Sequence, residues 1–178
     1  MKCGGADESR QARSREARDG ARPAAAKTAV IALANPEHVE IVALLGQSDA
    51  YHASLYPAES NHLVSAAELA GENVRFLVAR IGGTAVGCGA LLIGSDGAAE
   101  IKRMFVAPAA RGRQLGRQIL LALEREAAAA GVHVIRLETG VRQPEALALY
   151  RSHGYSERGP FGDYRPDPLS AFFEKWTG

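Results

Sequence analysis

Apolar residues between positions 28 and 106 are grouped in short runs that turn signals separate. Four runs have the length and the residue types of strands: residues 28–34, 74–80, 84–93 and 98–106. Gly82-Gly83 is a strong hairpin signal, and Ser95-Asp96-Gly97 turns the chain again. Pro108 ends the fourth run, because proline cannot donate to a strand ladder. The last three runs are therefore predicted to form an antiparallel meander.

Helical spacing of apolar residues appears in three segments: 36–51, 114–130 and 144–153. Asn35 is a good N-cap and Pro36 a good first residue for the first helix. Gly131 and Gly154 follow the other two, as expected of glycine just beyond a helix end. The pattern therefore predicts both the existence and the ends of three helices.

The remaining segments complete a mixed fold. Ser65-Ala66-Ala67-Glu68 is a capping-box pattern that predicts a short helix, and residues 52–61 are predicted to be a loop. Further strands are predicted at residues 134–139, 155–158 and 169–176. The order strand, helix, strand across residues 98–139 implies a parallel pair joined by a right-handed crossover. The predicted fold class is mixed α/β (α+β).

Composition limits the chain to one ordinary domain. Its 178 residues are 47% hydrophobic and 23% charged, with a net charge of +1, so no overall charge calls for nucleic acid or an anionic membrane. Residues 1–27 hold seven Lys/Arg against four Asp/Glu and almost no large apolar residue, which predicts a disordered basic tail. A solvated tail is the favoured interpretation of this segment, and a nucleic-acid arm is the weaker one. The domain itself is predicted to span residues 28–178.

Several classes of protein are not supported. The two cysteines cannot build a disulfide framework, and the five histidines show no metal-ligand spacing, so no metal is expected. No run approaches the roughly 18 apolar residues of a membrane helix, and no apolar segment typical of a signal peptide follows the basic start. The sequence also lacks the Gly-x-Ser-x-Gly elbow of many hydrolases. The expected location is the cytoplasm.

The turn from Arg111 to Arg117 has the chemistry of an anion site. It lies between a predicted strand and a predicted helix, and a helix N-terminus presents unpaired N–H groups and partial positive charge. Gly112 and Gly116 let a ligand approach the backbone, and three arginines add full charges. A pyrophosphate would fit such a turn.

The pattern Arg111-Gly112-Arg113-Gln114-Leu115-Gly116 closely resembles the acyl-CoA signature of the GNAT N-acetyltransferases, with Gln114 where their first glycine is usual. The segment from Leu137-Glu138-Thr139 to Gly154-Tyr155 resembles the closing part of the same family, with Gln143 in place of the usual Asn. Together the two segments cover residues 98–158. The resemblance implies a GNAT-type mixed sheet, with an antiparallel N-terminal meander plus a parallel strand pair joined by a crossover helix.

The resemblance also implies an acyl-CoA-dependent enzyme with acetyl-CoA as co-substrate. Tyr150 would protonate the leaving thiolate, its alternative role being an aromatic core anchor. Glu138 ranks ahead of Glu100 as the general base, and the alternative for each is a salt bridge. The amide of Val106 would polarise the thioester carbonyl in a slot where the flanking strands diverge. The coenzyme-binding positions implied are Phe105, Val106, Arg111, Gly112, Arg113, Gln114, Leu115, Gly116, Arg117 and Gln143.

The sequence is consistent with more than one class of acetyl acceptor. A small-molecule amine is the leading interpretation, a protein N-terminus or lysine is the second, and a non-catalytic acyl-CoA sensor is the third. Tyr51, His52, Tyr56 and His62 are candidates to line the acceptor pocket, but a plain packing or surface role is the favoured interpretation of each. The loop 161–167 suits either selection of a cationic amine or a rigid turn. A homodimer is consistent with the resemblance, because many relatives pair.

Overall fold

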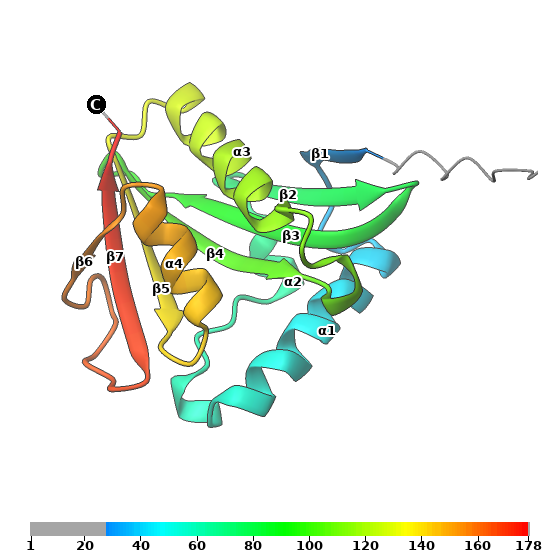
Figure 1. Cartoon of the computed structure of the whole chain (residues 1–178). Helices are drawn as coiled ribbons and strands as arrows, with labels where there is room; N and C mark the ends of the chain where they lie inside the picture. The colour runs from blue at the N-terminus through cyan, green and yellow to red at the C-terminus, as the bar shows by residue number, and fades with distance from the viewer. Residues whose placement is uncertain (1–27, 178) are drawn as a thin grey trace, which may run out of the picture.

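The computed structural model describes residues 28–177 as one mixed sheet with helices on both faces (Figure 1). The strands follow the spatial order β1-β2-β3-β4-β5-β7-β6. All neighbouring pairs are antiparallel except β4 and β5, which are parallel and joined by helix α3. This arrangement confirms the predicted fold class. The strands are β1 (Ala29–Leu33), β2 (Val74–Ile81), β3 (Thr84–Ile93), β4 (Ala98–Val106), β5 (Val134–Gly140), β6 (Ser156–Arg158) and β7 (Ser170–Trp176).

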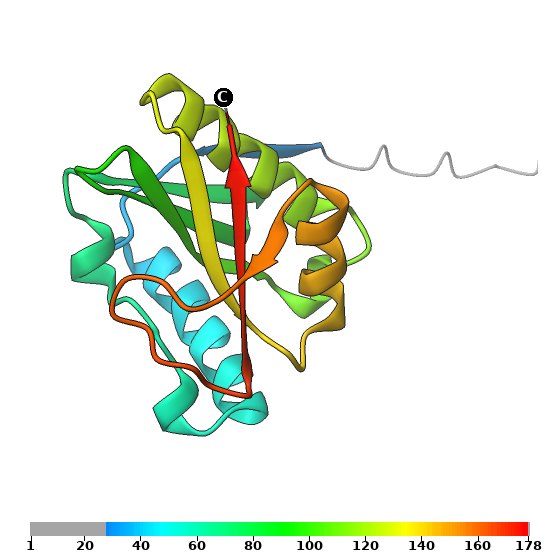
Figure 2. The same ribbon diagram turned by 90° about the vertical axis from the view of Figure 1, so that its left-hand side faces the viewer.

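Two apolar clusters hold the helices to opposite faces of the sheet. One cluster joins α3 and Tyr150 of α4 to the sheet, and the other joins α1 and Leu69 of α2 to the opposite face. The helices are α1 (Val39–Leu55), α2 (Ala66–Leu69), α3 (Leu115–Ala129) and α4 (Pro144–Ser152), with short 3-10 turns at η1 (Ala58–Ser60) and η2 (Pro108–Ala110). Figure 2, a quarter turn away, shows α1 and α3 on either side of the strands.

Local turn chemistry accounts for several boundaries that the sequence predicted correctly. Gly82 and Gly83 take positive φ values of 58° and 90°, so the β2–β3 hairpin closes between Ile81 and Thr84. The capping box is present: Ser65 Oγ accepts from the Glu68 N–H, and the Glu68 carboxylate accepts from the Ser65 N–H. The outcome is that β3, β4 and α2 lie where their patterns indicated.

Helix α1 differs from its prediction at both ends. It begins at Val39 rather than residue 36, because Asn35 Oδ1 accepts from the Glu37 N–H and forms a local turn before the helix. It continues to Leu55, so the loop predicted for residues 52–61 was wrong in part. The Arg142 guanidinium donates to the Leu55 carbonyl at 2.7 Å and satisfies that helix end from 87 residues away.

Strands β4 and β5 separate after a short parallel contact. They pair only from Ala98 with Val134 to Ile101 with Leu137. Beyond Ile101, β4 continues for five residues to Val106 with no partner on the β5 side. The predicted divergence is therefore present, and it opens the sheet between β4, β5 and the start of α3.

A β-bulge lies in β4 at the point where the strands separate. Arg103 has a positive φ of 57°, and the β3–β4 register shifts between Cys88 and Ala90. Before the bulge Ile101 packs on the α3 face, whereas after it Phe105 packs on the α1 face. The extra residue therefore exchanges the faces to which odd-numbered residues of β4 point.

No helix within residues 28–177 is both long enough and apolar enough to cross a membrane. The tail predicted for residues 1–27 lies outside the described residues.

Candidate active site

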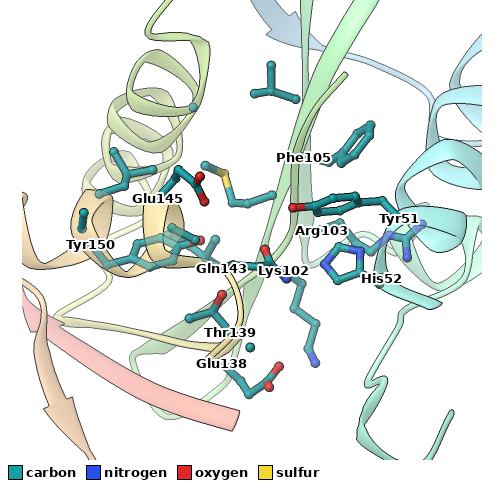
Figure 3. A pocket seen from close by; sticks show the side chains of 18 of the residues that line it. Tyr51, His52, Lys102, Arg103, Phe105, Glu138, Thr139, Gln143, Glu145 and Tyr150 are labelled. Atoms are coloured by element: carbon teal, nitrogen blue, oxygen red, sulfur yellow. The ribbon is translucent and has the colours of Figure 1, made fainter. Parts of the chain in front are cut away.

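A cavity of about 690 Å³ occupies the opening between β4 and β5. Its walls come from β4, β5, the C-terminal half of α1, the start of α3 and one side of α4. Figure 3 shows Glu138, Gln143 and Tyr150 on one side of this space, with Tyr51 and His52 on the other. Since each wall belongs to a different element, the fold as a whole determines the shape of the cavity.

The start of α3 presents its backbone to this cavity without a side-chain cap. Gln114 is the N-cap residue in the left-handed region, with φ of 56°, and no side chain bonds the first turn. Gly112 also has a positive φ of 78°. The first intrahelical bond runs from the Gln118 N–H to the Gln114 carbonyl, so the N–H groups of Leu115, Gly116 and Arg117 have no helical partner. These are the donors that the anion site predicted from the turn would need.

The arginines of the turn have different positions. Arg111 lines the cavity, with its guanidinium 4.8 Å from the Tyr51 ring centroid and its Nε 3.3 Å from the Val106 carbonyl. Arg117 also lines the cavity, but Arg113 does not. The Arg113 carbonyl instead accepts from the Gln118 side chain at 3.2 Å. The cavity is lined by nine of the ten predicted coenzyme-binding residues: Phe105, Val106, Arg111, Gly112, Gln114, Leu115, Gly116, Arg117 and Gln143.

Tyr150 is both a packing residue and a cavity residue. It is only 4% exposed, and its ring centroid lies 5.7 Å from that of Tyr155 and 6.0 Å from that of Phe173. Burial raises the pKa of its hydroxyl well above the usual range, and the charge of Glu138 raises it further. The side chain is therefore a protonated phenol at neutral pH, held rigidly at the edge of the cavity.

The two candidate bases have different environments. Glu138 lines the cavity and accepts a 2.6 Å hydrogen bond from the Ser170 hydroxyl on β7. Burial raises the pKa of the Glu138 carboxyl, while the Ser170 bond and the charges of His62 and Lys102 oppose that rise. A carboxylate with a raised pKa is a stronger base than an exposed one.

Glu100 does not line the cavity. Its Oε1 accepts a 2.6 Å hydrogen bond from the Tyr164 hydroxyl and lies 3.2 Å from the Lys102 ammonium. The salt bridge proposed as its alternative role is therefore present. Of the two carboxylates, only Glu138 reaches the space where a substrate would bind.

All four residues named as candidates for the acceptor pocket line the cavity: Tyr51, His52, Tyr56 and His62. Tyr56 also contacts the chain just after β5, because its hydroxyl accepts from the Arg142 N–H at 2.9 Å. Its ring lies so close to Gly140 that a Cβ there would be 2.1 Å from the ring. Tyr56 thus fixes the short β5–α4 connection that carries Gln143, the N-cap residue of α4.

His52 has a defined tautomer. Its Nδ1 lies 2.8 Å from the Ser48 carbonyl oxygen, which can only accept, so Nδ1 carries the proton. In the neutral ring Nε2 is then a hydrogen-bond acceptor. Sequence reasoning named His52 but gave no basis for this orientation, because it depends on α1 continuing past residue 51.

The structure adds cavity residues that sequence reasoning did not assign to the site, including Lys102, Thr139 and Glu145, and it places Tyr164 of the loop 161–167 there as well. Tyr164 belongs to the loop whose composition had marked it as unusual, but nothing in its sequence pointed to Glu100, 64 residues away. Among residues 28–177 there is no group of three His, Cys, Asp or Glu side chains arranged to hold a metal ion.

Comparisons with known proteins agree with this geometry. Residues 35–155 match the model of the acetyltransferase (GNAT) family. An IAA acetyltransferase of Azospirillum brasilense is 53% identical over 146 residues, covering 82% of this chain and 95% of that protein. A solved structure from Klebsiella pneumoniae, assigned as an acyl-CoA N-acyltransferase, superposes with a TM-score of 0.72 at 39% identity, covering 84% of this chain and 97% of that one.

A more distant structure shows the same fold. The PaiA N-acetyltransferase of Thermoplasma acidophilum, solved in complex with coenzyme A, has a TM-score of 0.67 at 20% identity, covering 84% of this chain and 99% of that one. The shared architecture therefore extends well beyond the range of close sequence similarity.

Proposed function

The chain belongs to the GNAT acetyltransferase family, and on that premise we propose that it moves an acetyl group from acetyl-CoA to a primary amine of a small molecule. The reaction proceeds by direct attack in a ternary complex. The name of the 53% identical relative, IAA acetyltransferase, supports a small acceptor. The observation that carries the proposal is that one cavity contains the uncapped start of α3 together with Glu138 and Tyr150.

The residues of this cavity suit the parts of acetyl-CoA. The free N–H groups at Leu115, Gly116 and Arg117 are donors for a pyrophosphate. The unpaired side of β4 at Phe105 and Val106 offers backbone groups to the amides of pantetheine, as an added strand would. The bound acetyl-CoA supplies an activated thioester, and the protein supplies the position.

The transfer needs proton movements that this cavity can provide. Glu138 accepts a proton from the bound ammonium, which frees the nitrogen lone pair for attack on the thioester carbonyl. A C–N bond forms, the C–S bond breaks, and the Tyr150 hydroxyl gives its proton to the leaving thiolate. The second proton that the nitrogen loses on becoming an amide returns to the Tyr150 oxygen. Glu100 has a weaker claim to the base role, because Lys102 and Tyr164 already occupy its carboxylate.

Thermal unfolding with acetyl-CoA tests the coenzyme site without knowledge of the acceptor. A ligand at about 100 times its Kd adds about 2.7 kcal/mol of stability. For a chain of this size each kcal/mol raises Tm by roughly 2–4 °C, so a shift of about 5–11 °C is expected.

A matched pair of variants at Gly116 sharpens this test. A Cβ at Gly116 would lie 3.6 Å from Leu149, an ordinary contact, so Gly116→Ala is expected to retain most of the shift. Gly116→Leu places a bulky side chain at the helix start and is expected to abolish it. Absence of any shift in the natural chain at millimolar acetyl-CoA would contradict the proposed function.

A further inference from the structure

The loop between β6 and β7, residues 159–169, reaches across to the cavity through one aromatic side chain. Tyr164 lines the cavity, and its ring lies edge-on to His62 with centroids 5.0 Å apart. On its other sides it contacts Phe161 at 5.1 Å and Phe172 at 5.4 Å. Tyr164 and His62 therefore form an aromatic wall between segments about 100 residues apart.

Polar contacts hold the same wall in place. The Tyr164 hydroxyl donates to Glu100 at 2.6 Å, and the Lys102 ammonium contacts that hydroxyl. Lys102 also lies 3.2 Å from Glu100 and 3.4 Å from the His62 carbonyl. One ammonium on β4 thus joins the loop 159–169 to the segment after η1. Since these acceptors surround it, Lys102 acts as a structural link rather than as a free cation.

This wall stands away from the coenzyme end. Figures 1 and 2 both place the β6–β7 loop beside the segment between α1 and α2 and away from the start of α3. Glu138 lies on β5 between the two ends of the cavity, within range of the charges of His62 and Lys102. An amine that meets Glu138 therefore has the Tyr164–His62 wall behind it.

We propose that Tyr164 determines acceptor size: with His62 it closes the acceptor end of the cavity, so that a compact amine fits and a polypeptide N-terminus does not. This inference rests on the proposed function and names its acceptor class. A polypeptide acceptor needs an open path for the chain that follows its reacting nitrogen. The wall and its hydroxyl anchor on Glu100 block that path.

Binding of two bisubstrate conjugates tests the proposal without turnover. In one, coenzyme A is joined through an acetyl bridge to the nitrogen of phenethylamine. In the other, it is joined in the same way to the N-terminus of tetra-alanine. The natural chain is expected to bind the phenethylamine conjugate more tightly by about tenfold or more, the discrimination that one shaped pocket provides.

Variants of Tyr164 test whether the Tyr164–His62 wall causes this difference in affinity. Tyr164→Ala removes the ring and is expected to bring the ratio of the two Kd values close to one. Tyr164→Phe keeps the ring contacts but loses the bond to Glu100, so it is expected to lower the ratio by a smaller factor. Trp176→Ala is the matched control, because Trp176 is a 70% exposed aromatic residue of β7 outside the cavity wall, and the ratio should not change.

The outcomes separate this proposal from the proposed function. If the natural chain binds neither conjugate nor coenzyme A itself, the proposed function fails. If coenzyme A binds but the natural chain holds the two conjugates equally, or the ratio is unchanged in Tyr164→Ala, the wall does not select the acceptor. Should Tyr164→Ala fail to fold and bind no coenzyme A, Tyr164→Phe decides, and an unchanged ratio there overturns the inference.

Discussion

Replacement of Gly140 by alanine adds one methyl group and is nevertheless expected to destabilise the protein strongly. The new Cβ would lie 2.1 Å from Cζ and from the hydroxyl oxygen of Tyr56. Tyr56 is 6% exposed, and its hydroxyl accepts from the Arg142 N–H at 2.9 Å. The ring therefore cannot move aside without giving up both its packing and this hydrogen bond.

The magnitude follows from those two losses. Overpacking a well-filled site costs about 1–3 kcal/mol. Loss of a buried hydrogen bond adds about 1 kcal/mol. The sum is about 2–4 kcal/mol, which corresponds to a fall in Tm of roughly 4–16 °C for a chain of this size.

Urea and thermal unfolding of the full chain measure this cost, and Gly46 supplies the matched control. No atom lies within 4 Å of a Cβ built at Gly46, which is in the middle of α1, so Gly46→Ala should stabilise by about 0.5–1 kcal/mol. The same substitution thus has opposite signs at the two glycines. A Gly140→Ala variant within about 0.5 kcal/mol of the natural chain, the usual range for surface changes, would refute the reasoning.

Three further predictions concern the reaction and its pH dependence. Tyr150→Phe should lower kcat by about a hundredfold or more, the contribution of a general acid, with the acetyl-CoA thermal shift retained; equal turnover would remove Tyr150 from the mechanism. Because burial raises the pKa of Glu138, its ionised form is disfavoured in the folded state, and the resulting cost is absent at low pH and grows as pH rises from its unfolded pKa to its folded pKa. Glu138→Gln should therefore increase urea stability at pH 7.5 but not at pH 3, and a gain of the same size at both values would contradict this cause. Ser170→Ala removes the hydrogen bond that lowers the pKa of Glu138, so the rising limb of kcat/KM against pH should move to higher pH, and Ser170→Thr should restore it; an unmoved limb would show that Glu138 is not the base.

Much of the fold could be predicted because local chemistry sets it. The hairpin glycines at Gly82 and Gly83, the Ser65–Glu68 capping box and the glycine after α3 each act within a few residues. The uncapped start of α3 also depends on adjacent residues, so the sequence could predict it as a candidate anion site. The family resemblance supplied the remainder, namely the roles given to Glu138 and Tyr150.

Features that depend on distant contacts could not be predicted in this way. The end of α1 is set by Arg142, which donates to the carbonyl of Leu55. The distinction between Glu138 and Glu100 depends on Tyr164, which occupies one carboxylate and leaves the other in the cavity. In each case the deciding partner is more than 60 residues away, and no periodicity or spacing records such a pairing.

The bulge at Arg103 has a consequence for how β4 tolerates change. The strand contains two phases of alternation, one up to Ile101 and the opposite one from Met104 to Val106. Loss of the one extra residue at the bulge would merge the phases into a single regular alternation, with Ile101 still on the α3 face and Phe105 still on the α1 face. The gene can therefore lose one codon at the bulge without exchanging the two faces, whereas loss of a codon from the regular stretch between Ala98 and Ile101 would turn the residues on one side of it to the opposite face.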